Sequence, residues 1–123
     1  MNAALDAIYA RWTATMGATP LYIVEADEGA AFPYAVASIV SDTPDGTFTE
    51  DYEDCLFQFN LFSTTSNTTQ VGDIFESLKA AFDKHDLNIV GCTTISLKRV
   101  NSFLIKLEGV WQINVTYRLV FEI

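Results

Sequence analysis

The segment from Trp111 to Ile123 carries apolar side chains at every second position. These are Trp111, Ile113, Val115, Tyr117, Leu119, Phe121 and Ile123, and polar residues stand between most of them. A period of two predicts a β-strand that buries one face and presents the other to water or to a partner. At ~3.3 Å per residue this strand is over ~40 Å long, more than a small domain covers easily. We interpret this strand as an edge of the sheet. An unpaired edge offers its backbone to another chain, so the strand predicts self-assembly.

The size of the chain predicts one domain over residues 1–123. Half of its 123 residues are hydrophobic, and a chain of this length buries about two-thirds of the surface that its unfolded form exposes. Cys55 and Cys92 form no CxxC motif and are expected to pack in the core. The sequence shows neither a leader pattern nor a run of ~20 apolar residues, so we expect a soluble protein of the cytosol, away from the membrane.

The charge balance is strongly acidic. Sixteen acidic residues against seven basic ones give a formal net charge of −9. This charge repels phosphate and argues against a protein that reads nucleic acid. It suits a passage through which DNA slides without sticking, and it equally suits a surface charge that keeps a hydrophobic chain soluble.

Periodicity predicts two amphipathic helices and several strands. Leu5, Ile8 and Trp12 recur at helical spacing in the first helix, and the run from Val71 to Phe82 forms the second. Strands are expected at 21–24, 32–40, 55–62, 87–90, 95–100, 103–107 and 111–123. This order predicts an α+β fold in which a curved, largely antiparallel β-sheet packs two amphipathic helices on one face.

The segment of about 41–54 is predicted to be a projecting acidic hairpin. Pro44 and Gly46 are typical turn residues, so the chain is expected to reverse there. Its six carboxylates are Asp42, Asp45, Glu50, Asp51, Glu53 and Asp54. They lack the ligand spacing of an EF-hand loop, so a solvated loop or a surface for a partner is expected instead of a calcium site.

No catalytic, cofactor or metal site is predicted. His85 is the only histidine, and its place near the end of the second helix suits the helix dipole better than catalysis. The six glycines are too dispersed to cradle phosphate, and hydrolase, zincin and nucleotide motifs are absent from the sequence. A hydrolase with paired carboxylates stays open, although nothing marks two of the acids as buried.

The order of these elements resembles the tail-completion and tail-terminator family of long-tailed bacteriophages. The resemblance rests on a short N-terminal helix, on Leu21-Tyr22 and on three longer segments. Glu28 to Val36, with Phe32-Pro33-Tyr34, looks like the family's entry strand. The strand Phe57 to Ser63 and the helix after it are similar to the family's centre, and Gly109 to Glu122, with Tyr117-Arg118, is similar to its closing strand.

The resemblance implies a structural virion protein without catalytic residues. Such a protein forms a ring, a hexamer, at the head-proximal end of the tail tube. It ends tube polymerisation and presents a surface to the connector or neck proteins of the head, while DNA passes through the lumen without sequence-specific binding. The implied location is the tail and neck of the virion, after assembly in the cytoplasm of the host bacterium.

Two surfaces are predicted for partners. The acidic hairpin, with Asp42, Asp45, Phe48, Glu50 and Asp51, is expected to dock on the tail tube or the neck. The end of the last strand, with Val120, Phe121, Glu122 and Ile123, is expected to form the subunit interface. The core is predicted to contain Leu5, Ile8, Trp12, Phe57, Phe59, Phe75, Leu78, Phe82, Ile113, Val115 and Tyr117.

Two other functions fit the same composition. A small acidic α+β dimer that acts as chaperone for an exported protein also combines low pI with amphipathic helices. A small curved-sheet enzyme with an apolar pocket would require a buried polar pair that the sequence does not display. Size in solution separates the dimeric chaperone from the ring.

Overall fold

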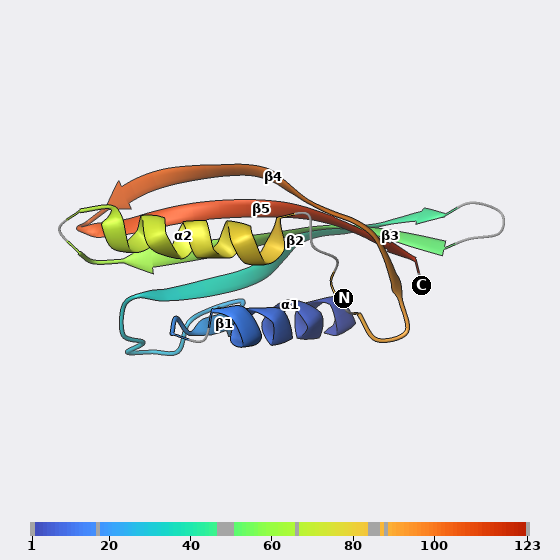
Figure 1. Cartoon of the computed structure of the whole chain (residues 1–123), viewed down its shortest axis with the longest axis horizontal. Helices are drawn as coiled ribbons and strands as arrows, with labels where there is room; N and C mark the ends of the chain where they lie inside the picture. Colours follow the sequence, from blue (N-terminus) through green and yellow to red (C-terminus); the bar gives the residue numbers. More distant parts are fainter. Residues whose placement is uncertain are drawn as a thin grey trace.

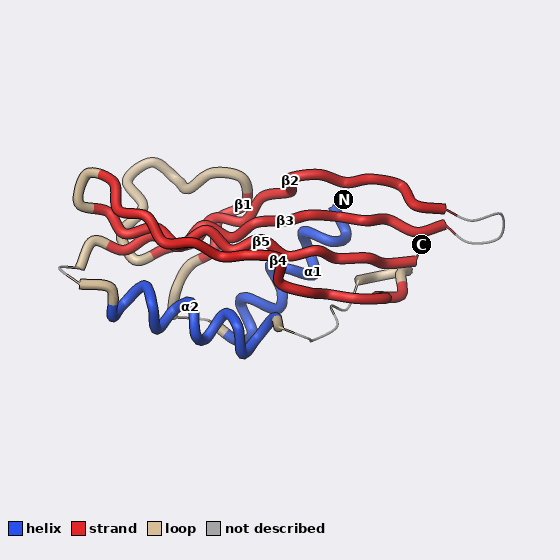
Figure 2. Tube along the Cα trace, turned by 90° about the horizontal axis from the view of Figure 1, so that it is seen from above, coloured by secondary structure: helices blue, strands red, loops and turns tan. Residues whose placement is uncertain are grey.

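The computed structural model describes residues 2–16, 18–46, 51–65, 67–83, 87 and 89–122. It contains two helices and five strands in the order α1(Asn2–Thr15), β1(Leu21–Ile23), β2(Tyr34–Gly46), β3(Asp51–Ser63), α2(Thr69–Phe82), β4(Thr93–Leu107) and β5(Val110–Glu122). The strands form one open, curved sheet of order β1-β2-β3-β5-β4, in which only the β1–β2 pair is parallel. Both helices lie on the same face of this sheet (Figures 1 and 2). The predicted α+β fold is confirmed.

The C-terminal strand lies inside the sheet. β5 pairs with β3 on one side and with β4 on the other, antiparallel in both cases. The sequence interpretation of β5 as an edge is therefore wrong. Alternation shows that a strand buries one face, but it carries no information about which neighbours lie on its two sides. Within the described residues the edge strands are β4 and the β1–β2 side.

The segment before β5 forms one long strand where the sequence indicated two. β4 runs through Asn101 and Ser102 as a 15-residue strand. Both residues pair regularly, with Thr116 and Val115, and the nearest irregularity in the register lies between Arg99 and Asn101. Glu108 and Gly109 connect it to β5 with φ angles of 52° and 80°, the positive pair that a tight two-residue hairpin requires. Of the strand expected at 87–90, the described residues 87, 89 and 90 are not in a strand.

The β2–β3 hairpin is longer than the sequence suggested. Its register continues from Tyr34 opposite Phe62 to Gly46 opposite Asp51, with a bulge between Ile39 and Ser41. Residues Ser41–Gly46, which were expected to form the turn, are therefore strand. Pro44 is compatible with this position because it lies on an edge strand, where a missing N–H costs little.

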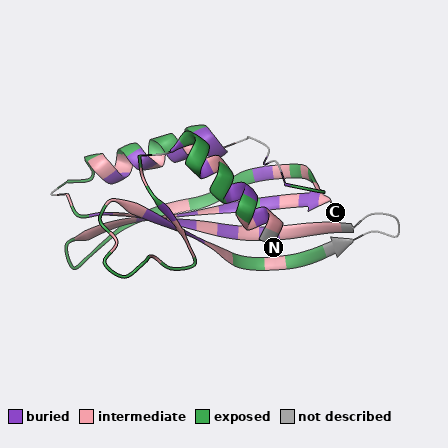
Figure 3. Cartoon of the chain, turned by 90° about the horizontal axis from the view of Figure 1, so that it is seen from below, coloured by how far each residue is buried: buried purple, intermediate pink, exposed green. Residues whose placement is uncertain are grey.

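The core lies between the sheet and the two helices. Figure 3 shows the buried stripes of both helices turned toward the buried positions of the strands. Nine of the eleven predicted core residues are buried: Ile8, Trp12, Phe57, Phe59, Leu78, Phe82, Ile113, Val115 and Tyr117. Leu5 and Phe75 are only partly buried. Phe75 lies at the border, where the Lys79 ammonium stands 4.9 Å from its ring centroid, so its truncation costs less than that of a central aromatic.

Aromatic rings fix the helices on the sheet. The Phe59 ring stands 5.3 Å from Trp12 of α1 and 5.0 Å from Phe82 of α2, measured between centroids. The Trp12 indole Nε1–H donates to the Thr19 carbonyl oxygen at 2.7 Å, and Arg11 Nε donates to the Ala81 carbonyl oxygen at 2.9 Å. Phe59 is therefore the point at which α1, α2 and β3 meet.

Candidate functional site

The structure describes some of the predicted hairpin residues and not others. Asp42 pairs with Cys55, and the backbones of Asp45 and Asp51 pair with those of Tyr52 and Gly46 near the end of the hairpin. Phe48 and Glu50 lie outside the described residues, as do the side chains of Asp45 and Asp51. Asp42 is thus the one member of the predicted docking surface whose side chain is described.

Asp42 lies beside Glu53 in the strand part of the hairpin. A hydrogen bond to the Asp42 carboxylate, followed by burial and by the charge of Asp42, raises the pKa of Glu53 above its ordinary value. Asp42 Oδ1 is shielded from solvent and has no hydrogen-bond partner. As long as both groups are ionised, neither can donate to the other. The pair therefore places two negative charges side by side, and the positive charge of the N-terminus, which lowers the pKa of Glu53, offsets their repulsion only in part.

Cys55 is the cross-strand partner of Asp42 and is buried in the core. Burial is the main cause that raises the pKa of its thiol to about 11, and the charge of Asp42 adds to it. Such a thiol is protonated at neutral pH and is a poor nucleophile or metal ligand. Cys92 is partly buried, and both cysteines are free. The expected packing role of Cys55 agrees with its exposed fraction of 1%.

The carboxylate pair leads to a pH-dependent prediction. We expect Glu53→Gln to raise the free energy of unfolding at pH 7 by about 0.5 kcal/mol, because it removes a like-charge contact that solvent partly screens. A carboxyl whose pKa is raised on folding stabilises the fold below its unfolded pKa, and this contribution is lost as pH rises through the folded pKa. The gain should therefore vanish at about pH 4. Urea denaturation at both pH values measures it.

Glu76→Gln is the matched control for this prediction. Glu76 faces Lys79 at 2.8 Å, so its neutralisation removes an attraction and should lower stability slightly at pH 7. An equal response of the two variants would show that Asp42 exerts no repulsion on Glu53.

Arg118 of β5 neutralises the next acid of the hairpin. Its Nε donates to Asp54 Oδ1 at 2.9 Å and its Nη2 to Asp54 Oδ2 at 2.5 Å. These hydrogen bonds hold the pKa of Asp54 below its ordinary value. The Arg118 side chain is 55% exposed, so the pair contributes modestly to stability and mainly fixes the position of the two groups.

The predicted subunit interface lies at the end of β5. Val120, Phe121 and Glu122 pair with Asp54, Glu53 and Tyr52 on one side and with Ser96, Thr94 and Thr93 on the other. Phe121 is buried, and Ile123 lies outside the described residues. The backbone of Val120, Phe121 and Glu122 is thus paired within the chain. An interface at 120–123 stays a prediction, and it would depend on side chains such as Val120 and Glu122.

The edge strand β4 is a candidate surface that sequence reasoning missed. Its exposed apolar side chains are Ile95, Val100, Phe103, Leu104, Ile105 and Leu107, with exposed fractions between 40% and 66%. The strand also contains Lys98, Arg99 and Lys106 and no acidic residue. In a chain of net charge −9, fifteen residues with three cations and no acid could have been noticed as a cationic strand.

The middle of this strand is held by a polar network at Arg99. The Tyr117 hydroxyl donates to Asp83 Oδ1 at 2.6 Å, and Arg99 Nη2 lies 3.3 Å from Asp83 Oδ2. Burial, and then the hydrogen bond to Asp83, raises the pKa of Tyr117 far above its ordinary value. The hydroxyl therefore stays protonated and acts as a donor. The network ties β4 and β5 to the end of α2.

The sheet face opposite the helices is polar at its centre and aromatic at one side. Gln58 Nε2 donates to Thr116 Oγ1 at 3.3 Å, and Gln112 Nε2 donates to Asn114 Oδ1 at 2.7 Å. Toward β1, the rings of Tyr22, Phe32, Tyr34 and Phe62 form an aromatic cluster with centroid distances of 5.0 to 5.9 Å. We call these four residues the aromatic border.

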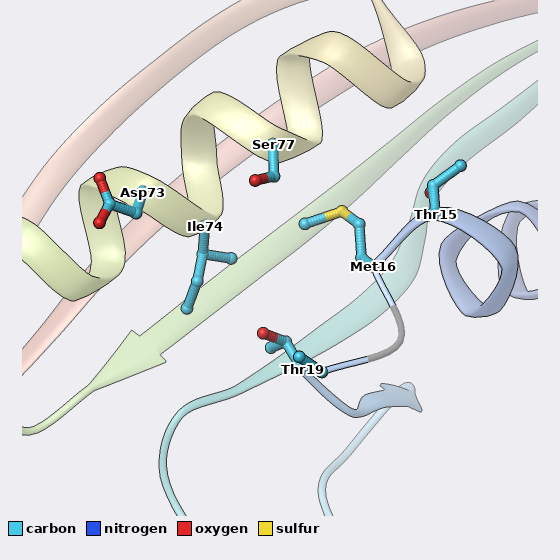
Figure 4. Close-up of a pocket in the computed structure, with 7 residues that line it drawn as sticks. Thr15, Met16, Thr19, Asp73, Ile74 and Ser77 are labelled. Carbon is cyan, nitrogen blue, oxygen red and sulfur yellow. The ribbon is translucent and has the colours of Figure 1, made fainter.

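A hollow of about 250 Å³ lies where α1 ends beside α2, lined by Met16, Ile74, Asp73 and small side chains (Figure 4). It has the form of a gap between two elements, with Asp73 as the charged group of its lining. Within the described part of the chain, no group of three or more His, Cys, Asp or Glu residues could hold a metal ion. Its helices are also too short or too polar to cross a membrane.

Comparisons with known proteins agree with this architecture. A chain in the virion of a native gene transfer agent particle has a TM-score of 0.69 at 13% identity, over 89% of this chain and 83% of that chain. Another solved chain, which carries no functional name, has a TM-score of 0.67 at 15% identity, over 98% of this chain and 93% of that chain. At these identities the likeness shows a shared fold. A search of curated proteins gives no match.

The family comparison extends over all the elements described above. The family model of tail completion protein gp17 matches residues 4–122, which include α1 from Ala4 onward, α2 and all five strands. The resemblance expected from the sequence is confirmed: this chain belongs to the tail completion protein gp17 family.

Proposed function

We propose that this protein forms a hexameric ring at the head-proximal end of a phage tail tube, where it ends tube polymerisation and joins the tail to the head connector. Membership of the tail-completion family, over residues 4–122, is the observation that carries the proposal. It makes the chain a structural protein of the phage tail. A related fold occurs in a chain of the gene transfer agent virion.

Two features of the molecule support a ring. The sheet is open, with β4 unpaired along one edge among the described residues, and an open edge is a ready site for another strand. A contact between two different edges is head-to-tail, and such contacts close into rings when the rotation per subunit permits. The net charge of −9 suits a lumen through which DNA passes without sequence-specific contacts.

The proposal is tested by complementing a phage that lacks this protein. Without it, we expect tubes of irregular and excessive length and few joined heads. Wild-type protein should restore uniform tails, and electron microscopy of purified tails should show one ring at the head-proximal end. Normal tail lengths in its absence, or a location at the distal tip, would refute the proposal.

The end of the hairpin is proposed to contact the tail tube or the neck. The residues concerned are Asp45, Phe48, Glu50 and Asp51, whereas Asp42 lies in the strand part next to Glu53. We expect the triple variant Asp45→Lys, Glu50→Lys, Asp51→Lys to melt within a few degrees of wild type, since surface changes are usually small. It should complement poorly, because charge reversal opposes the approach of the partner.

The variant is assayed by a circular dichroism melt and by phage titre at low and moderate salt. A control that replaces Glu25, Asp27 and Glu28 with lysine changes the charge equally in another loop. Full titres from the hairpin variant would contradict the proposed contact and would indicate that these residues form only a solvated loop.

A further inference from the structure

β4 forms one long side of the molecule and leaves apolar side chains exposed along it (Figure 1). No described strand lies beside its outer edge. Its register shifts between Arg99 and Asn101, and Val100, the residue at this irregularity, is 54% exposed. Bulges on edge strands commonly turn a side chain away from the regular ladder. Val100 is therefore an apolar side chain at the edge that stays largely uncovered.

The opposite long side is formed by α1 and β1, and it contains a hollow (Figure 1). The hollow measures about 390 Å³ and is lined by Leu5, Asp6 and Tyr9 of α1 and by Ile23 of β1. Leu5 and Tyr9 are one turn apart on one side of α1, and Trp12 is buried in the core. A helix with apolar side chains around most of its circumference is typically covered on more than one side. The outer side of α1 thus suits a contact with another chain.

We propose that the β4 edge of one copy packs against the α1–β1 side of the next copy, with Val100 in the hollow beside Tyr9. The inference rests on the proposed ring and names its contact. β1 stays beside β2 and β4 stays beside β5 in each copy, so the contact is made by side chains and needs no new strand pairing. Because each copy offers one surface of each kind, the contact is head to tail and can close into a ring.

The register of the sheet brings the two surfaces to the same position along the strands. Residues paired across the strands form a row, and Ile23 lies in the row of Phe59 and Ser102. Trp12 packs on Phe59 at 5.3 Å between ring centroids, so it marks the same position on α1. α1 and β4 run in the same direction (Figure 1). When two copies lie side by side in one orientation, the hollow, which extends from Ile23 toward the start of α1, therefore lies beside Val100.

The charges of the two surfaces are opposite. β4 contains three cations and no acid, whereas Asp6 has no ion pair with a described residue. Arg99 pairs with Tyr117, which is buried under the helices, so Arg99 lies on the sheet face that α1 also covers. Its Nη2 lies 3.3 Å from Asp83, and a guanidinium has five N–H donors, so it can also donate to Asp6 of the next copy. A two-fold contact of β4 with β4 would instead bring two cationic strands together.

Reciprocal charge variants test the contact. Val100→Glu sets a carboxylate in an apolar hollow beside Asp6, so it should lower the association constant between copies at least about tenfold. Asp6→Lys sets a lysine beside Arg99 and should lower it similarly. The double variant should recover to within about threefold of the wild type, because the two new charges are opposite.

Ile95→Glu and Asp73→Lys are the matched controls. Ile95 lies at the other irregularity of β4 and is 52% exposed, and Asp73 is an exposed acid of α2. Both variants should assemble as the wild type does. All four positions are exposed, so each variant should keep the wild-type melting temperature within a few degrees.

Assembly is measured on purified protein by native mass spectrometry and on tails from complemented cells by electron microscopy, so a ring that forms only on the tail is also counted. Rings that form equally well with Val100→Glu would overturn this contact and leave the proposed function standing. Absence of a ring in both wild-type samples would overturn the proposed function as well.

A photo-crosslinking residue at position 100 locates the neighbour directly. We expect crosslinks to the tryptic peptide that ends at Arg11 and contains Asp6 and Tyr9. Because α1 and β4 lie on opposite long sides of one molecule (Figure 1), such a crosslink identifies a second copy. Crosslinks between two copies of β4, or crosslinks exclusively to another tail protein, would contradict the inference.

Discussion

Phe59→Ala is expected to lower the free energy of unfolding by about 3 to 5 kcal/mol and the melting temperature by more than about 10 °C. The Phe59 side chain has no exposed surface, and its ring contacts those of Trp12, Phe57, Phe82 and Tyr117 at centroid distances of 5.0 to 6.0 Å. Four rings cannot all move into the space that its removal leaves. The cavity cost therefore adds to the lost burial of the ring.

The measurement is urea denaturation followed by circular dichroism. Phe103→Ala provides the control, because it deletes the same ring from a side chain that is 49% exposed, and it should change stability by no more than about 0.5 kcal/mol. If the two variants unfolded at the same urea concentration, the assignment of Phe59 to the centre of the core would fail.

The second large effect is expected for Trp12→Ala, at about 3 to 5 kcal/mol. Trp12 is 1% exposed, and it is the main anchor of α1: it packs on Phe59, and its Nε1–H donates to the Thr19 carbonyl oxygen at 2.7 Å. The loss should be greatest in α1. Hydrogen exchange of α1 amides should accelerate more than that of β3 and β5 amides, since local opening of the helix becomes easier than global unfolding.

Trp12→Phe separates the two contributions of this side chain. It keeps a ring against Phe59 and removes the donor to Thr19, so we expect a cost of about 1 to 2 kcal/mol. Tyr9→Ala, on the exposed side of the same helix, should leave α1 exchange unchanged. Uniform acceleration across all elements in Trp12→Ala would mean that α1 does not open independently of the sheet.

The sequence predicts which segments form helices and strands better than it predicts which strands pair with one another. The alternation in β5 identifies its length and its buried face, and the helical spacing from Val71 to Phe82 identifies α2 with its buried Val71, Ile74 and Leu78. Pairing is different, because the same alternation fits a central strand and an edge strand equally. The prediction of an edge at β5 was wrong for this reason.

For the candidate surfaces too, the sequence shows composition but not which residues come into contact. The acidic composition of the hairpin is visible in the sequence, and Asp42 does lie at a sheet edge. The repulsion between Asp42 and Glu53 depends on their contact across two strands, which composition does not contain. The β4 surface was missed because Asn101 and Ser102 divide it into two short apolar runs. A scan for charge sign along the strand would have found it.

The central position of β5 also has a consequence for synthesis. A ribosome produces the chain from its amino end, and until Val110–Glu122 has been made, β3 and β4 have no strand to join them. Until then the nascent segments have unpaired backbone groups and exposed apolar faces. Chains in this state are prone to aggregation. The pairing of β3 with β5 and of β5 with β4 is thus concentrated in one step, and the two parts of the sheet join only when β5 is in place.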